Sequence, residues 1–272
     1  MVGLTLFIGE PSDLNPTKFA LVIGNARSGT TIIGSILDAH PRMICANETG
    51  ASISQWLNLT RDGILADLLS NCEVAHATNR PSSGYFYAIS TPPKSVSAID
   101  VVGDKIFNPT LLMLHGDNNL LSRLSETMAC QIFVVHCVRN PFDVIATMHH
   151  RSGASLLNRT RWYFMHCEAA QALIERAELN IATFYHEDFS GRRTDQVVRL
   201  YAFLGHYAPP EVIERVRAVL FNKPRRTRDL IEWPADVVDE VTQQMSRFPF
   251  LQRYSRSLVA EPAAAEADRQ PA

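Results

Sequence analysis

Short runs of apolar residues alternate along this chain with longer stretches in which apolar residues recur at helical spacing. The runs cover residues 19–23, 99–102, 131–138 and 181–185. The run at residues 19–23 is apolar without interruption, which is typical of a strand buried on both faces of a parallel sheet, and the other runs are strand-like. The helical stretches cover residues 30–39, 110–124, 142–150, 160–177 and 194–204. Strands that alternate with helices predict a three-layer α/β fold, with helices on both faces of a central parallel sheet.

One domain is the simplest division of the chain. Its 272 residues fit a single α/β domain, and 46% of them are hydrophobic, so a sizeable core is available. We expect one domain over residues 1–258 and a disordered tail over residues 259–272, which are rich in Ala, Pro and Glu. Residues 51–96 show only one amphipathic stretch, near residues 64–69, and we expect them to form loops or a cap.

Charge and cysteine usage narrow the classes of partner. The formal net charge of −2 gives no global attraction to nucleic acid or to an anionic membrane. The five cysteines form no Cys-X-X-Cys pair, which predicts reduced thiols in a cytoplasmic protein and no zinc site. No segment approaches the roughly 18 apolar residues of a membrane-spanning helix. We therefore expect no metal, no nucleic-acid partner and no membrane span; the oligomeric state is open.

A glycine-rich turn follows the first apolar run. Residues 24–31 read Gly-Asn-Ala-Arg-Ser-Gly-Thr-Thr, between an expected strand and an expected helix. Backbone N–H groups at such a turn can hold an anion, and the glycines let the chain approach it closely. The spacing is that of the Walker A loop, but Thr30 stands where a P-loop NTPase has its phosphate-binding lysine. The cation has moved to Arg27, inside the loop, and this weakens the case for ATP chemistry.

A second cationic motif follows the run of residues 131–138. Arg139 stands at the carboxyl end of that expected strand, where ligands bind in open α/β sheets. Thr147 and Arg151 are four residues apart and share one face of the helix that follows. Two guanidinium groups and a hydroxyl suit a dianionic phosphate. A solvated basic helix is the alternative interpretation of this motif taken alone.

The two motifs together resemble the PAPS-dependent sulfotransferases. The loop, the Leu-Asp-Ala-His-Pro segment at residues 37–41 and Cys-Ala-Asn-Glu-Thr at residues 45–49 are nearest in pattern to the tyrosylprotein sulfotransferases and their bacterial relatives. The resemblance spans residues 19–151 and, more weakly, extends to Tyr254. It implies the P-loop-NTPase-like sulfotransferase fold and PAPS as co-substrate. The implied donor-binding residues are Arg27, Ser28, Gly29, Thr30 and Thr31 for the 5′-phosphosulfate, and Arg139, Thr147 and Arg151 for the 3′-phosphate.

The resemblance also implies a catalytic set. Arg27 would stabilise the charge that develops on the bridging oxygen, and Glu48 would take the proton of the acceptor hydroxyl. Lys105 is a second candidate cation, in a Lys-Ile-Phe-Asn-Pro run. The cytosolic sulfotransferases carry a histidine base where this chain has Phe107, and this difference favours Glu48 as the base.

Two later segments add weaker candidates for the donor site. Tyr185 opens a Tyr-His-Glu-Asp-Phe run that resembles the family's Tyr-Glu-Asp-Leu segment, which implies a contact with the 3′-phosphate or the adenine. Arg226 and Thr227 lie in a basic loop comparable to a late family segment that folds over the nucleotide. A solvated loop is the alternative for such a basic run.

The sequence thus predicts direct in-line transfer of a sulfuryl group from PAPS to an acceptor hydroxyl, giving PAP and a sulfate ester. The acceptor could be a small molecule, a sugar, a lipid or a peptide tyrosine, and residues 51–96 would lie on its side of the site. One alternative is a nucleotide-dependent kinase with a displaced Walker lysine. Another is a nucleotide-binding protein without catalytic activity.

Overall fold

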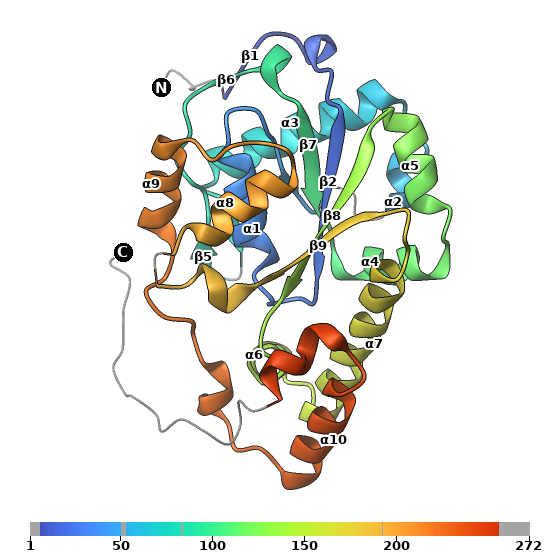
Figure 1. Ribbon diagram of the computed structural model, residues 1–272, viewed down its shortest axis with the longest axis vertical. Helices are drawn as coiled ribbons and strands as arrows, with labels where there is room; N and C mark the ends of the chain where they lie inside the picture. The colour runs from blue at the N-terminus through green and yellow to red at the C-terminus, as the bar shows by residue number, and fades with distance from the viewer. Residues whose placement is uncertain (1–5, 50–52, 83, 192, 256–272) are drawn as a thin grey trace.

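A parallel sheet of five strands forms the centre of the molecule (Figure 1). The structure is a computed structural model, and it describes residues 6–49, 53–82, 84–191 and 193–255; the predicted tail over residues 259–272 lies outside them. In spatial order the strands are β3 (Ala46–Asn47), β7 (Val101–Lys105), β2 (Lys18–Gly24), β8 (Gln131–Val138) and β9 (Asn180–Tyr185). The strand order reverses at β2, so the turn after β2 opens into the crevice where ligands bind in open α/β sheets.

Alternate residues of β2 enter two separate hydrophobic cores, one on each face of the sheet. Phe19 and Leu21 belong to one core, whereas Ala20 and Val22 belong to the other. The first core is closed by α3 (Arg61–Ala77), α4 (Asn108–Gly116), α5 (Leu120–Met128) and α7 (Leu156–Ile174). The second is closed by α1 (Thr30–Asp38), α8 (Asp195–Phe203) and α9 (Pro210–Val219). The predicted fold class, a three-layer α/β fold around a parallel sheet, is confirmed.

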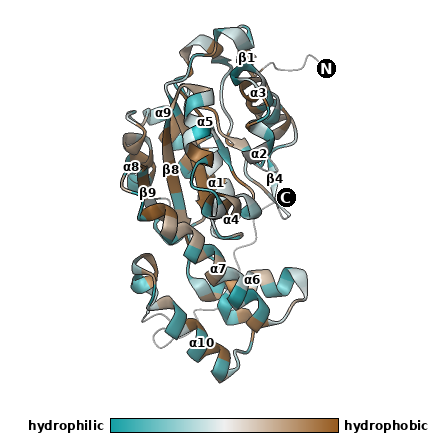
Figure 2. Ribbon diagram, turned by 90° about the vertical axis from the view of Figure 1, so that its right-hand side faces the viewer, coloured by the Kyte–Doolittle hydropathy of each residue, from teal (hydrophilic) through white to brown (hydrophobic). Residues whose placement is uncertain are grey.

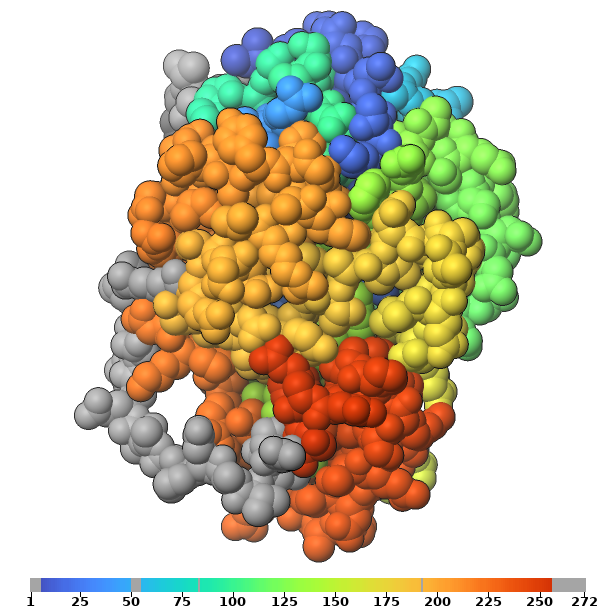
Figure 3. All heavy atoms as spheres, in the orientation of Figure 1, coloured from blue at the N-terminus to red at the C-terminus, as the bar shows by residue number. Residues whose placement is uncertain are grey.

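A third hydrophobic cluster lies beyond the carboxyl ends of the strands. It is built from α6 (Pro141–Ser152), the amino-terminal half of α7, α10 (Ala235–Met245) and the 3-10 turn Pro249–Tyr254. Figures 1 and 2 show these helices as a separate group below the sheet, and Figure 3 shows how closely residues of the last turn pack under those of β9. Ala26, in the turn after β2, packs against this group.

The remaining elements are short. They are α2 (Ile53–Trp56), β1 (Phe7–Ile8), β4 (Pro81–Ser82), β5 (Tyr85–Phe86) and β6 (Lys94–Ser95), with 3-10 turns at Pro11–Asp13, Val96–Ala98, His186–Phe189 and Thr227–Leu230. Strands β4 and β5 pair as an antiparallel hairpin, and β1 pairs with β6. None of the helices in the described part of the chain combines the length and the hydrophobicity that a bilayer span requires.

Several predicted elements have other bounds in the structure, and for two of them a polar side chain gives the reason. The helix predicted over residues 110–124 is two helices, because the carboxylate of Asp117 accepts a hydrogen bond from the N–H of Asn119 (2.9 Å) and turns the chain between them. The strand predicted over residues 99–102 begins at Val101 and continues to Lys105. Asp104 and Lys105 are polar but buried, so hydrophobicity alone ends this strand too early.

Candidate functional site

The turn after β2 requires glycine at both of its ends. Gly24 has a φ of +153°, and a Cβ at this position would lie 2.5 Å from the carbonyl oxygen of Cys137 on β8. Gly29 has a φ of +94° and is the N-cap of α1. A Cβ on Gly29 would lie 2.3 Å from Nδ1 of His186. Side chains are therefore excluded at both positions, and the backbone itself is the surface that a ligand could approach.

The middle of the turn is closed by Ser28. Its N–H and its hydroxyl both donate to the carbonyl of Asn25, at 3.1 and 2.7 Å. Helix α1 then begins at Thr30, and Gly29 provides no side-chain cap. The N–H groups in the first turn of a helix have no partner within the helix and attract anions. The predicted anion-binding residues Ser28 to Thr31 thus form the end of the loop and the first turn of α1.

Arg27 has an unusual backbone and a crowded electrostatic environment. Its φ is +75°, which a residue with a side chain seldom adopts outside special sites. Burial lowers the pKa of Arg27; the charges of Arg151 and Arg139 lower it further, while Tyr87 opposes them. The predicted arginines are therefore close enough to repel one another, and an anion among them would relieve that repulsion.

Arg139 connects the loop to a distant segment. The residue follows β8 and is 9% exposed. Its guanidinium donates to the carbonyl of Arg27 (3.2 Å) and to the carbonyl of Arg225, while its Nε is buried and has no hydrogen-bond partner. The backbone after it is held by the carboxylate of Glu187, which accepts from the N–H of Asn140 (2.9 Å). Arg139 is thus fixed between the loop and residues 225–228.

The hydroxyls of Thr147 and Thr227 meet on α6, the helix that follows Arg139. Their Oγ1 atoms lie 2.9 Å apart, and each also lies 2.7 Å from the carbonyl oxygen of Asp143. The late basic loop is fastened to α6 by Arg228, whose guanidinium lies 2.6 Å from the carboxylate of Asp143. The structure therefore brings together two motifs that are 80 residues apart in the sequence.

Two other predicted donor-site residues have their described contacts elsewhere. The ring of Tyr185 lies 4.2 Å from the guanidinium of Arg253 and 6.1 Å from the ring of Tyr254. Arg226 forms an ion pair with Asp229 (2.8 Å). The proposed contacts of Tyr185 and Arg226 with the donor remain predictions.

Glu48 and Lys105 form an ion pair on the other side of β2. Lys105 ends β7, in register with Val22, and its side chain is 7% exposed. Its Nζ lies 2.5 Å from Oε1 of Glu48, whose side chain is 41% exposed and whose φ is +60°. The N–H of Glu48 also donates to the carbonyl of Lys105 (2.9 Å). The predicted catalytic residues thus form two groups, with Arg27 in the loop and the Glu48–Lys105 pair at the next strand end.

The sequence interpretation missed His186. This residue packs against Gly29, and burial, followed by the charge of Arg139, lowers its pKa to about 3. His186 is therefore neutral near pH 7 and adds no charge to the loop. The available signal was the spacing: the chain has one residue between tyrosine and glutamate where the family segment has none.

The sequence interpretation also missed the hairpin of β4 and β5. The guanidinium of Arg225 donates to the hydroxyl of Tyr85. Burial raises the pKa of Tyr87, and the nearby charge of Arg27 opposes this shift. Tyr85 therefore lies beside Arg225, and Tyr87 lies near Arg27. A small hollow of about 100 Å³ opens here. It is lined by Ile32, Tyr85, Phe86, Tyr87, Ala218, Val219 and Phe221.

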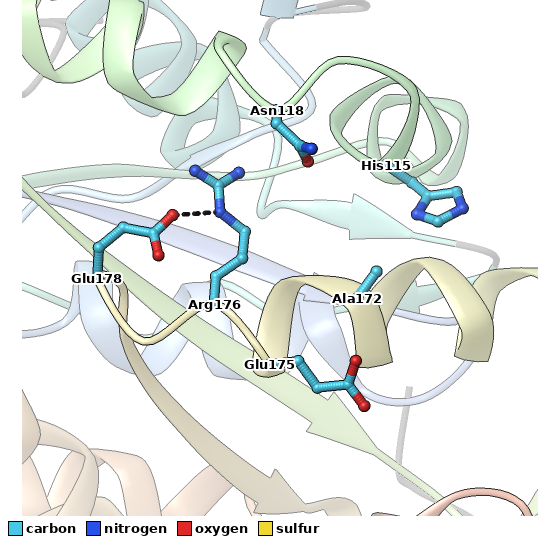
Figure 4. A pocket seen from close by; sticks show the side chains of 6 residues that line it. All are labelled: His115, Asn118, Ala172, Glu175, Arg176 and Glu178. Carbon is cyan, nitrogen blue, oxygen red and sulfur yellow. Dashed lines mark hydrogen bonds and ion pairs between the residues drawn. The ribbon is translucent and has the colours of Figure 1, made fainter.

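A larger surface hollow, of about 380 Å³, lies elsewhere, and no residue of the turn after β2 lines it (Figure 4). Its lining comprises His115, Asn118, Ala172, Glu175, Arg176 and Glu178. Arg176 and Glu178 already form an ion pair there, at 2.6 Å. Within the described ranges, no group of three or more His, Cys, Asp or Glu side chains could hold a metal ion.

Acidification should destabilise the protein well before its carboxylates titrate. Burial lowers the pKa of His40 and of His136 to about 4, and the pKa of His186 to about 3. Unfolded histidines take up a proton near pH 6.5, so between about pH 6.5 and pH 4 the unfolded chain binds more protons than the folded one. The free energy of unfolding should therefore fall with pH in this window, by up to about 1.4 kcal/mol per pH unit for each histidine.

Urea unfolding at pH 7, 6 and 5 measures this dependence. The His136→Gln variant lacks one of the protons that the chain takes up on unfolding, so its free energy of unfolding should depend less steeply on pH. A free energy of unfolding that stays constant from pH 7 to pH 5 would contradict the prediction.

No protein-family profile and no curated protein sequence matches this chain. Solved structures of sulfotransferases are similar to it at low identity. The sulfotransferase domain of the Synechococcus PCC 7002 olefin synthase is 15% identical, over 85% of this chain and 94% of that one, with a TM-score of 0.49. A sulfotransferase from Alicyclobacillus acidocaldarius is 16% identical, over 90% of this chain and 95% of that one, with a TM-score of 0.44. A mouse sulfotransferase complexed with PAP is 13% identical, over 94% of this chain and 89% of that one, with a TM-score of 0.41.

These similarities include bacterial and mammalian sulfotransferases, and none of them points to the tyrosylprotein sulfotransferases in particular. The narrower resemblance therefore remains a prediction from the motifs.

Proposed function

We propose that the protein is a sulfotransferase that moves a sulfuryl group from PAPS to an acceptor hydroxyl. The observation that carries this proposal is the second cationic group beside the phosphate loop. Arg139 donates to the carbonyl of Arg27 in the loop (3.2 Å), and Thr227 meets Thr147 on α6, the helix that follows Arg139. PAPS has a 3′-phosphate for this second group, whereas ATP has none.

The described residues fit the anionic ends of such a donor. The loop backbone and Arg27 would hold the 5′-phosphosulfate, because side chains are excluded at Gly24 and Gly29. Arg139 would hold the 3′-phosphate through a charge-assisted hydrogen bond, and the two threonine hydroxyls would donate to it in place of the carbonyl of Asp143. The unpartnered Nε of Arg139 is a buried donor that a phosphate oxygen would satisfy.

The aromatic hollow adjoins this second group, and we assign it to the base of the donor. Arg225 joins the two: its carbonyl accepts from Arg139, and its guanidinium donates to Tyr85. Aromatic side chains such as Tyr87 and Phe221 offer stacking surfaces to a base. The hairpin would then serve the donor, while the acceptor-side role predicted for residues 51–96 stays a prediction for α2 and α3.

The catalytic roles follow from where charge develops. A bond forms between the acceptor oxygen and sulfur while the bond from sulfur to the bridging oxygen of PAP breaks. Arg27 would stabilise the negative charge on that leaving oxygen. Glu48 would accept the acceptor's proton, and Lys105 would hold the carboxylate in place at 2.5 Å.

Exchange of Arg139 for alanine should weaken the binding of adenosine 3′,5′-bisphosphate about tenfold to a hundredfold, the range expected for lost charge-assisted hydrogen bonds. Calorimetric titration measures this. Adenosine 5′-monophosphate lacks the 3′-phosphate, so its weaker binding should change little in the variant. Arg61→Ala is the matched control, because Arg61 also donates to a backbone carbonyl, that of Met128 (3.0 Å).

Preferential binding of ATP with magnesium would contradict the proposal and favour the kinase alternative. Equal loss of bisphosphate and monophosphate binding in Arg139→Ala would remove the assignment of the 3′-phosphate to this group.

A further inference from the structure

The carboxylate of Asp38, at the end of α1, is the centre of a buried charged cluster. Its Oδ2 lies 2.8 Å from Nη2 of Arg80 and 2.7 Å from Nε2 of His76, and its Oδ1 lies 3.2 Å from Nζ of Lys94. The side chains of Asp38, Arg80 and Lys94 are at most 2% exposed. A carboxylate so far from water requires partners of this kind.

The same cations also hold the chain that follows α1. Nη2 of Arg80 donates to the carbonyl of Cys45 (2.7 Å), and Nζ of Lys94 donates to the carbonyl of Met43 (2.7 Å). Burial would raise the pKa of Asp38, but Lys94, Arg80 and His76 outweigh it and hold that pKa well below its usual range. The Asp38 carboxylate is therefore ionised, and Arg80 and Lys94 join it to residues 43–45.

The three partners of the Asp38 carboxylate come from the two sides of one hairpin. His76 lies in the last turn of α3 and Arg80 directly precedes β4, whereas Lys94 begins β6. The chain leaves the carboxylate at Arg80, forms the hairpin that carries Tyr85, and returns to the same carboxylate at Lys94. Arg80 also has a φ of +44°, a conformation that persists only where its surroundings impose it.

We propose that Asp38 is a positioning residue of the donor site, which fastens both ends of the hairpin and so sets Tyr85 and Tyr87 beside Arg225 and Arg27. This inference rests on the function proposed above. Helix α1 begins at the phosphate loop and ends at Asp38, so one rigid helix of nine residues joins the loop to the cluster.

Hydrogen exchange in the ligand-free protein tests the positioning directly. The N–H of Tyr87 donates to the carbonyl of Arg80 (3.2 Å), and the N–H of Ala88 donates to that of Asn79 (3.4 Å). In Asp38→Asn these two amides should exchange at least about tenfold faster than in the wild-type protein. The amides of β2 report on global opening, so any rate increase measured there is subtracted first. Asp100→Asn is the matched control, since Asp100 also pairs with a lysine and a histidine, Lys18 and His206.

Binding of adenosine 3′,5′-bisphosphate provides the second measurement. Asp38→Asn should weaken binding about tenfold in the wild-type background, and less than about twofold when Tyr85 and Tyr87 are both alanine, because the hairpin then has nothing to position. If Asp38→Asn does not fold, His76→Gln, which changes a partly exposed member of the cluster, should give the same pattern with smaller values.

Unchanged exchange at Tyr87 and Ala88, or equal weakening in both backgrounds, would overturn the inference. If the wild-type protein does not bind the bisphosphate at all, the proposed function fails, and the exchange experiment still decides whether Asp38 holds the hairpin.

Discussion

Exchange of Arg27 for alanine is expected to lower kcat for sulfuryl transfer by about a hundredfold to a thousandfold. A positioned cation stabilises the leaving oxygen only as the bond to sulfur breaks, and loss of one such donor has effects of about this size in other enzymes. Arg27 sits in the loop itself, with its carbonyl held by Arg139 at 3.2 Å. The loss should therefore appear in kcat, and because the 5′-phosphate of PAP carries the same oxygen, the affinity for PAP should fall as well.

The measurement is consumption of PAPS, with and without an acceptor, beside calorimetric titration of PAP. Arg27→Lys should recover part of the rate, because lysine keeps a positive charge but not the planar fork of arginine. Arg217→Ala is the matched control, as Arg217 is an exposed arginine paired with Glu214 at 2.7 Å on α9. An Arg27→Ala variant that retains more than about a tenth of the wild-type kcat would contradict the role.

Exchange of Glu48 for glutamine is expected to lower kcat by about a hundredfold to ten-thousandfold, the range for removal of a general base. Glutamine keeps the shape of the side chain and an oxygen that can still accept from Lys105, so the surroundings should persist. The affinity for PAP should change less than about twofold, because Glu48 belongs to the group at β7 and not to the donor loop.

Acceptors of graded acidity sharpen this test. Among ring-substituted phenols, the more acidic ones need less help in losing the proton, so the deficit of Glu48→Gln should shrink along the series. Glu178→Gln is the matched control, since Glu178 also forms an ion pair, with Arg176 at 2.6 Å. A deficit that is equal for all phenols would indicate that Glu48 only holds Lys105 in place.

The fold was predictable where hydrophobicity alone decides the structure. Residues 19–23 are apolar without interruption because both faces of β2 are buried, and this pattern is visible in the sequence. The pattern failed where a polar side chain decides: Asp117 turns the chain within a predicted helix, and buried Asp104 and Lys105 extend a strand.

The candidate site could be predicted only where it consists of local motifs. The loop at residues 24–31 and the Arg139 motif are each contiguous in the sequence. Tyr85 meets Arg225 across 140 positions, a contact that only the assembled fold creates. The partners of Asp38 were equally hidden, because His76 and Lys94 belong to a stretch without clear periodicity.

Arg27 and Glu48 both have a left-handed backbone, which lowers the stability of the fold at the two positions whose side chains we propose to be catalytic. Glycine adopts positive φ without steric cost, whereas other residues pay on the order of 1 kcal/mol there. Selection for thermal stability alone would therefore favour glycine at both positions and would remove the guanidinium and the carboxylate together. Stabilised variants of this protein that carry either change should therefore lose the sulfuryl transfer in which we propose that these two side chains act.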